Sequence, residues 1–268
     1  MFRREMLVVE CDRTCAAFKG MSPWQATPPL HGSLFMKIPL WIALFLGCLL
    51  PQLCTANTPH IDPHAESLYQ QAVPYLKQAD AKLEAVPANF PTASADEKKR
   101  TQVLVEEAGE LLKPAIKLLE QAAALDHPVA QHRLAMIYVM FYPVDEIKEK
   151  ACPLLQSSFL QGFAPPALQL SSFCFEFTDT PEFQTTLKAI ATSAPAYEQY
   201  FPQPAVKLEC RAEMPQGMAL QWGSSRDYQA EMYRLLGDSN RAQRTEYYQQ
   251  AIAINDCYKA KKRLGLSQ

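Results

Sequence analysis

Residues 115–141 read AIKLLEQAAALDHPVAQHRLAMIYVMF, and this stretch decides the fold. It predicts two short amphipathic helices separated by a break at Asp126-His127-Pro128. On both sides of the break, apolar residues recur at the i, i+3, i+4 and i+7 spacing that places them on one helix face. The two stripes are Ala115, Leu118, Leu119, Ala122 and Leu125, then Ala130, Leu134, Ile137, Tyr138 and Phe141.

The same layout recurs 36 residues later without a gap, so that Ala115 corresponds to Ala151 and Phe141 to Phe177. A fixed period of this size is typical of helical repeats, whose units bury their apolar faces only by stacking on one another. We therefore expect an all-α fold, a right-handed α/α solenoid of about nine to eleven helices.

Further helices are expected on both sides of these two units. The spacing predicts helices over residues 66–85, with a kink at Pro74, and over 95–112 after a cap at Ser94 or Asp96. We expect Pro114 to open the next helix, because proline is tolerated in a first turn. Later helices are predicted over 181–193, over 226–256 with a tight turn at 237–239, and over 257–265.

These repeats resemble those of the tetratricopeptide-like and Sel-one-like families. The segment QAAALDHPVAQHRLAMIY resembles a Sel-one-like unit in its helix, polar turn, Ala-x-x-x-Leu and closing aromatic, and residues 226–256 resemble a tetratricopeptide unit. Asp126 stands where the family usually has glycine, and Gly162 holds that position in the second unit. The resemblance implies a scaffold that grips a protein or peptide on a concave surface.

The regular pattern fails over residues 194–225, which hold four prolines and no sustained period. A bare loop of this length is unusual in a compact domain, so we expect a short helix, an irregular cap or an insertion that packs Trp222 onto the solenoid. The chain is thus divided into N-terminal repeats (57–193), an irregular insert (194–225) and a C-terminal hairpin with a capping helix (226–268).

A secretory signal peptide is predicted at residues 36–56. Met36 and Lys37 precede the apolar run Ile38–Leu50, and Cys54-Thr55-Ala56 follows the small-x-small cleavage pattern. The apolar run is short for a membrane span. We expect residues 1–35 to be an over-called extension, cleavage after Ala56, no stable membrane insertion afterwards, and a bacterial periplasmic location. A membrane anchor is the alternative. A lipid-anchored cysteine at Cys48 or Cys54 is discounted, because Phe45-Leu46 and Leu53 do not fit the residues that usually precede such a cysteine.

Composition narrows the classes of function. The net charge is −2, and the sequence holds no Lys/Arg stripe with interleaved aromatics, which argues against a nucleic-acid partner. Only nine glycines are present and no glycine-rich phosphate loop is found, so we expect no cofactor.

Four cysteines follow residue 56, namely Cys152, Cys174, Cys210 and Cys257. An even number in an exported protein suggests disulfides, with three possible connectivities. In an antiparallel hairpin the start of the first helix lies beside the end of the second, which favours Cys152–Cys174 and leaves Cys210–Cys257. Buried free thiols are the alternative.

Other polar residues give weaker signals. His60, Asp62 and His64 could ligate a metal, although a solvated tail explains them as well, and we expect no metal site. His127 and His132 are interpreted as surface residues rather than catalytic groups, because no partnered nucleophile is recognisable. Arg133 and Gln169 are expected in solvent. The C-terminal end of the chain is basic, which favours the dipole of a helix C-terminus, and an anionic partner is the alternative; its residues are Lys259, Lys261, Lys262 and Arg263.

The insert carries four aromatic residues that no repeat core explains: Tyr197, Tyr200, Phe201 and Trp222. Because tyrosine and tryptophan dominate binding hot spots, an exposed contact patch is one interpretation of these four residues, and packing within the molecule is the other. The sequence thus predicts a non-catalytic, exported scaffold that binds a protein or peptide. An immunity or inhibitor protein that neutralises a secreted toxin or cell-wall enzyme is one alternative, and a cell-wall hydrolase is another.

Overall fold

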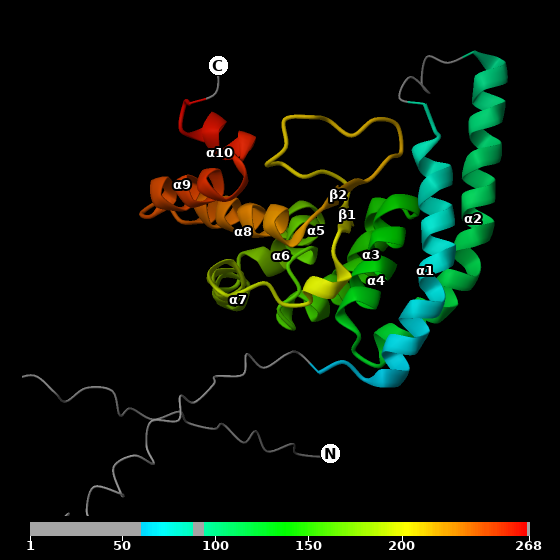
Figure 1. Cartoon of the computed structure of the whole chain (residues 1–268), viewed down its shortest axis with the longest axis horizontal. Helices are drawn as coiled ribbons and strands as arrows, with labels where there is room; N and C mark the ends of the chain where they lie inside the picture. The colour runs from blue at the N-terminus through cyan, green and yellow to red at the C-terminus, as the bar shows by residue number, and fades with distance from the viewer. Residues whose placement is uncertain (1–59, 88–93, 267–268) are drawn as a thin grey trace, which may run out of the picture. The chain divides into compact units, whose positions relative to one another are not determined.

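The computed structural model describes residues 60–87 and 94–266, which fold mainly as α-helices. Figure 1 shows these helices following one another along the chain, with one pair of short strands among them. The helical class predicted from the sequence is therefore confirmed. The predicted extension (1–35) and signal peptide (36–56) lie outside the described residues.

Helices α1 (Pro63–Glu84) and α2 (Ala95–Ala124) form a long antiparallel pair (Figure 1). The side chain of Asp62 caps α1, and Ser94 forms a capping box with Glu97 at the start of α2. Alanine recurs every seventh residue on both helices, which permits close approach of the two backbones. These fully buried residues are Ala65, Ala72 and Ala79 on α1, and Ala108, Ala115 and Ala122 on α2.

The prediction that a new helix begins at Pro114 is wrong, because α2 continues through this residue without a break. Proline removes the hydrogen bond to the carbonyl four residues earlier, here that of Glu110. Glu110 is exposed, so water can reach this end of the broken bond. Pro74 lies inside α1 in the same way, and it too is exposed.

Helices α3 (Pro128–Phe141) and α4 (Val144–Leu160) continue the antiparallel order, followed by α5 (Pro166–Phe173) and the single turn α6 (Phe175–Thr178). The turns before α3 and α5 each contain one left-handed residue, Asp126 with φ of 59° and Gly162 with φ of 88°. These residues occupy equivalent positions of the 36-residue period, which agrees with the correspondence read from the sequence.

Helix α7 (Pro181–Thr192) precedes the insert, defined as residues 194–225. The insert contains the 3-10 helix η3 (Glu198–Tyr200) and strands β1 (Gln203–Ala205) and β2 (Gln221–Gly223), which pair antiparallel with Pro204 opposite Trp222. A short helix in this segment was expected from the sequence, whereas the strand pair was not.

Helices α8 (Ser225–Ser239), α9 (Arg244–Asn255) and α10 (Tyr258–Arg263) complete the fold. The predicted tight turn at 237–239 is wrong, because α8 runs through Gly237 and the chain turns after Ser239. Gly237 serves packing instead: a Cβ at this position would collide with the ring of Tyr248 on α9. Gly237 is therefore needed for the close contact between α8 and α9, not for a turn.

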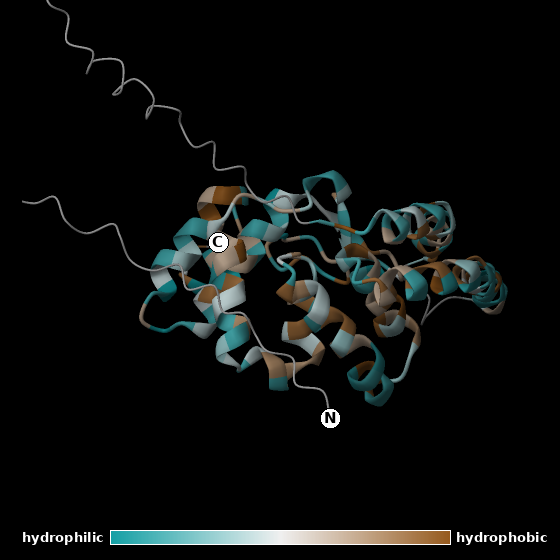
Figure 2. Cartoon of the chain, turned by 90° about the horizontal axis from the view of Figure 1, so that it is seen from below, coloured by the Kyte–Doolittle hydropathy of each residue, from teal (hydrophilic) through white to brown (hydrophobic). Residues whose placement is uncertain are grey.

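Most helices carry both hydrophobic and hydrophilic residues, as Figure 2 shows, whereas α3 is buried on all sides along residues 128–137. The buried residues form one cluster around α1, α2 and α3, a second around α4, α5, α7 and α8, and a third around α8, α9 and α10. Phe201 of the insert packs against both the first and the second cluster. The insert therefore joins parts of the chain that are far apart in sequence.

Both predicted cysteine pairs lie at disulfide distance. Cys152 and Cys174 have their sulfurs 2.00 Å apart, and those of Cys210 and Cys257 are 2.07 Å apart. The first bond ties α4 to the end of α5, and the second ties the insert to the start of α10. No helix within residues 60–87 and 94–266 is long and apolar enough to cross a bilayer.

Candidate functional site

The insert contacts helices from both halves of the described chain. The hydroxyl of Tyr197 donates a hydrogen bond to the carbonyl of Gln161 at 3.1 Å, and that of Tyr200 donates to the carboxylate of Glu66 on α1. The ring of Phe201 lies 5.9 Å from that of Phe163, measured between centroids. The insert is thus held by polar and apolar contacts together.

The exposed aromatic patch, one of the two interpretations of the sequence, is not present in that form. Tyr197 is buried, with 5% of its surface exposed, and Tyr200, Phe201 and Trp222 are half-buried. The guanidinium of Arg133 lies 5.3 Å from the ring centroid of Trp222, a distance suited to a cation–π contact. Most of the aromatic surface is therefore used within the molecule, and binding by these four residues stays a prediction.

A polar cluster anchors Tyr200. Glu66 accepts from Tyr200 and lies 3.1 Å from Nε2 of His127. Burial opposes ionisation of Glu66, but hydrogen bonds from Tyr200, Gln70 and His127 outweigh it and lower the pKa of this carboxyl. Burial and the bond to Glu66 raise the pKa of Tyr200. A carboxylate bound to a neutral phenol is therefore the stable arrangement.

His127 is fully buried, so its predicted surface position is wrong. Its Nδ1 accepts the backbone N–H of Ala130 at 3.3 Å and thereby caps α3. This network assigns the proton to Nε2, which donates to Glu66. Burial lowers the pKa of His127 despite the carboxylate beside it. Because both ring nitrogens are occupied, His127 cannot act as a general base in this arrangement.

Three further polar residues predicted to face solvent are also buried: His132, Arg133 and Gln169. Helix α3 is enclosed along residues 128–137, so its polar side chains lie inside. Arg133 donates to Asp80 of α1 at 2.9 Å. Burial, followed by the charge of Arg133, lowers the pKa of His132 to about 3. Arg133 therefore ties α3 to α1, whereas neither ring nitrogen of His132 has a hydrogen-bond partner within the described residues.

The N-terminal residues weighed as metal ligands have a structural role. Asp62 accepts the backbone N–H groups of His64 at 2.7 Å and Ala65 at 3.1 Å. These bonds lower the pKa of its carboxyl. His60 and His64 flank this cap. Within the part of the chain that the structure describes, no group of three or more His, Cys, Asp or Glu side chains is arranged to hold a metal ion.

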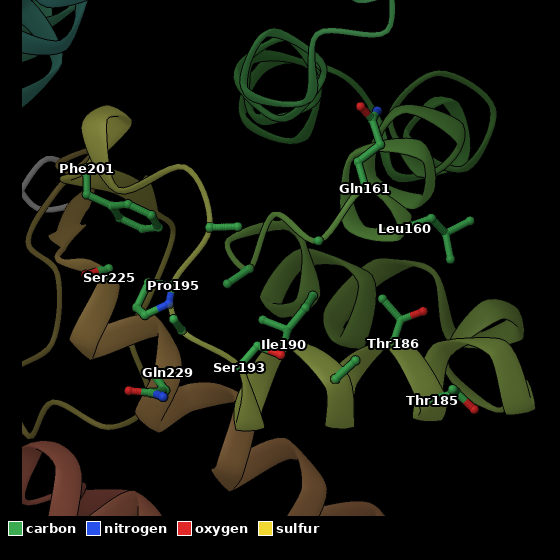
Figure 3. A pocket seen from close by; sticks show the side chains of 15 residues that line it. Leu160, Gln161, Thr185, Thr186, Ile190, Ser193, Pro195, Phe201, Ser225 and Gln229 are labelled. Carbon is green, nitrogen blue, oxygen red and sulfur yellow. The ribbon is translucent and has the colours of Figure 1, made fainter. Parts of the chain in front are cut away.

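The feature best suited to binding is an apolar pocket of about 390 Å³ beside the insert. Figure 3 shows Phe201, Pro195 and Ser225 on one side of it and Leu160 and Thr186 on the other. Helix α7 provides the floor. The lining is completed by Gln161, Gly162, Ala164, Thr185, Ala189, Ile190, Ser193, Ala194, Ala196 and Gln229.

The polar groups of this pocket are arranged around its apolar surface. Ser225 donates from its hydroxyl to Glu198 at 2.8 Å, and the side-chain amide of Gln229 donates to the carbonyl of Ala191 at 3.3 Å. Apolar pockets with a few hydroxyl and amide groups are typical of sites for small molecules and for single side chains of a peptide. Phe201 is the only member of the predicted aromatic set that lines it.

Comparisons of the chain with family models, with curated proteins and with solved structures find no match. The class of protein is defined here by the fold and the site: it is a helical protein with two disulfides and an apolar pocket beside an irregular insert.

Proposed function

We propose that this protein is an exported, non-catalytic binding protein that takes a peptide or a protein segment at the pocket beside α7. In this proposal the helical hairpins form a solenoid of the tetratricopeptide-like or Sel-one-like kind. The equivalence of the left-handed turns at Asp126 and Gly162 supports a true repeat, and the consecutive antiparallel packing of α1 to α4 supports stacking.

The observation that carries the proposal is the pocket itself. Its volume of about 390 Å³ suits one or two large apolar side chains rather than a folded surface. The exposed residues Leu160 and Ala189 lie at its edge, where a peptide backbone could lie against them.

Export is part of the proposal, and the two disulfides support it. Disulfides persist in oxidising compartments such as the bacterial periplasm and are rare in a reducing cytosol. The signal sequence predicted before Ala56 would provide the route.

Selection from a random peptide library tests the binding site. Enriched peptides should bind the protein saturably, and Ala189→Trp should weaken their binding at least tenfold by filling the pocket. Ala81→Trp is the matched control, because Ala81 is also exposed and helical but lies on α1 away from the pocket. Equal binding by both variants would contradict the proposed site.

Two measurements separate this proposal from its alternatives. An inhibitor or immunity protein would bind one secreted enzyme at nanomolar strength and abolish its activity. A hydrolase would degrade peptidoglycan in a gel-based assay, and that activity would be lost on replacing one polar residue.

A further inference from the structure

A second pocket, of about 250 Å³, lies between the end of α5, the insert and the C-terminal helices. Unlike the pocket beside α7, it is lined by charged side chains. Lys207 and Glu209 come from the insert, Arg234 and Asp238 from α8, and Lys259 and Arg263 from α10, while the uncharged lining residues come from α5 and the insert. The lining residues are Leu168, Gln169, Ser171, Ser172, Phe173, Val206, Lys207, Glu209, Arg234, Asp238, Lys259 and Arg263.

Positive charge exceeds negative charge in this pocket. Glu209 is shared between Lys207 at 3.3 Å and Lys259 at 3.1 Å. Asp238 is shared between Arg234 at 2.7 Å and Arg263 at 3.5 Å. Glu231 also pairs with Arg234, although it does not line the pocket. When Glu231 is counted, the pocket has four cationic side chains and three carboxylates.

Arg234 is built into the wall of the pocket. Only 5% of its surface is exposed, and it uses Nε to bind Glu231 at 2.6 Å and Nη1 to bind Asp238 at 2.7 Å. Its Nη2 has no hydrogen-bond partner among residues 60–87 and 94–266. Nη2 is not one of the buried polar atoms that lack a partner within the described residues, so it is open to the pocket and free to donate. A ligand with an acceptor oxygen would supply the missing bond.

Two other lining residues also have unused hydrogen-bonding capacity. The side chain of Gln169 is buried, and its Oε1 has no partner within the described residues. This oxygen is a buried acceptor, so Gln169 forms part of the wall and does not donate to an anion. Arg263 contacts Asp238 only through Nε, so both of its terminal nitrogens are available on the exposed side. Guanidinium groups of this kind bind carboxylate and phosphate oxygens in pairs.

We propose that this pocket binds a small oxyanion, a phosphate or carboxylate group, between Arg234 and Arg263. The pocket is smaller than the roughly 300–1,000 Å³ of sites for drug-sized ligands, so it fits a free ion or one charged group of a larger molecule. The site is independent of peptide binding, because it shares no lining residue with the pocket beside α7.

Calorimetric titration of the purified, disulfide-bonded protein at low ionic strength tests the proposal. Inorganic phosphate and succinate are the two probes, and they distinguish a phosphate site from a carboxylate site. We expect saturable binding of at least one probe at a single site. Arg263→Gln should weaken that binding about tenfold, because it removes charge-assisted hydrogen bonds. The affinity of Arg263→Lys should lie between those of the wild type and Arg263→Gln, since lysine keeps the charge but cannot form the paired hydrogen bonds of a guanidinium.

Arg100→Gln is the matched control, because it removes the same charge from an exposed position on α2. Ser172→Asp gives a second test from the opposite wall, where Ser172 is exposed and the new charge repels an anion. Ala189→Trp, which blocks the other pocket, should leave oxyanion binding unchanged. Absence of saturable binding by both probes, or equal loss in Arg100→Gln and Arg263→Gln, would overturn the proposal.

Discussion

Asp126 at the end of α2 and Gly162 at the end of α4 close their helices with the same hydrogen-bond pattern. The N–H of Asp126 donates to the carbonyl of Ala123 at 3.0 Å, and that of Gly162 donates to Phe159 at 2.9 Å. The next residue in each turn donates to the carbonyl five positions before it. This pairing is the Schellman arrangement, which needs a left-handed residue and favours glycine.

Replacing the left-handed residues should change stability in opposite directions. Asp126→Gly should raise the free energy of unfolding by about 0.5–1 kcal/mol, because glycine adopts positive φ without strain. Gly162→Ala should lower it by about 1–2 kcal/mol. Gly109→Ala is the control: Gly109 lies inside α2 with open space around it, so this change should stabilise. Urea unfolding measures all three, and a stabilising Gly162→Ala would contradict the equivalence of the turns.

The buried ion pair between Asp80 and Arg133 should behave differently from a surface pair. Asp80→Ala should lower the free energy of unfolding by about 3 kcal/mol, because it leaves the guanidinium buried without its partner. Adding Arg133→Met should recover most of that loss. Glu110→Gln breaks the exposed pair with Lys113 and should cost less than about 1 kcal/mol. Equal costs for Asp80→Ala and Glu110→Gln would show that burial is unimportant here.

His132 should make stability depend on pH. Burial lowers the pKa of His132 to about 3 from its ordinary value of 6.5, so below pH 6.5 the unfolded chain binds a proton that the native state does not. Stability should therefore fall as the pH decreases, by about 1.4 kcal/mol per pH unit from this group. His132→Gln should remove that part of the slope between pH 6.5 and 5, measured by urea unfolding. A slope that His132→Gln leaves unchanged would contradict this assignment.

The two disulfides should contribute unequally. The bond Cys152–Cys174 spans 22 residues and Cys210–Cys257 spans 47. In the loop-entropy account they stabilise by about 3 and about 4 kcal/mol respectively. Replacing each pair by serine and measuring urea unfolding tests this order. Peptide mapping of the non-reduced protein by mass spectrometry checks the pairing, and four alkylated thiols at these positions would contradict it.

The helices between residues 115 and 177 could be predicted from sequence because their signal is local. Apolar spacing and the recurring turn identify helices around Ala115–Phe177 without knowledge of the rest of the chain. The predictions at Pro114 and Gly237 are wrong, because proline usually opens a helix and glycine usually ends one. Exposure of Glu110 lets α2 continue through Pro114, and the ring of Tyr248 leaves no room for a side chain at Gly237; neither can be read from local spacing.

The burial of His132, Arg133 and Gln169 could not be predicted for a related reason. A polar residue on a repeat helix is usually solvated, and these become internal only because other segments cover them. Trp222 lies over Arg133, yet residues 194–225 have no period that would place them. The apolar pocket beside α7 was missed as well, since its lining comes from α4, α7, the insert and α8. Of the four aromatic residues that the sequence singled out, only Phe201 lines this pocket.

The bond between Tyr200 and Glu66 joins residues 134 positions apart. Linear arrays of stacked hairpins commonly fray from their ends, since each unit touches only its neighbours. In this protein helix α1 is bonded to the insert, which is synthesised much later. The pair formed by α1 and α2 therefore cannot complete its contacts until the insert has been made. Such long-range closure slows folding and makes unfolding more nearly all-or-none, in contrast to the gradual unzipping of an open array.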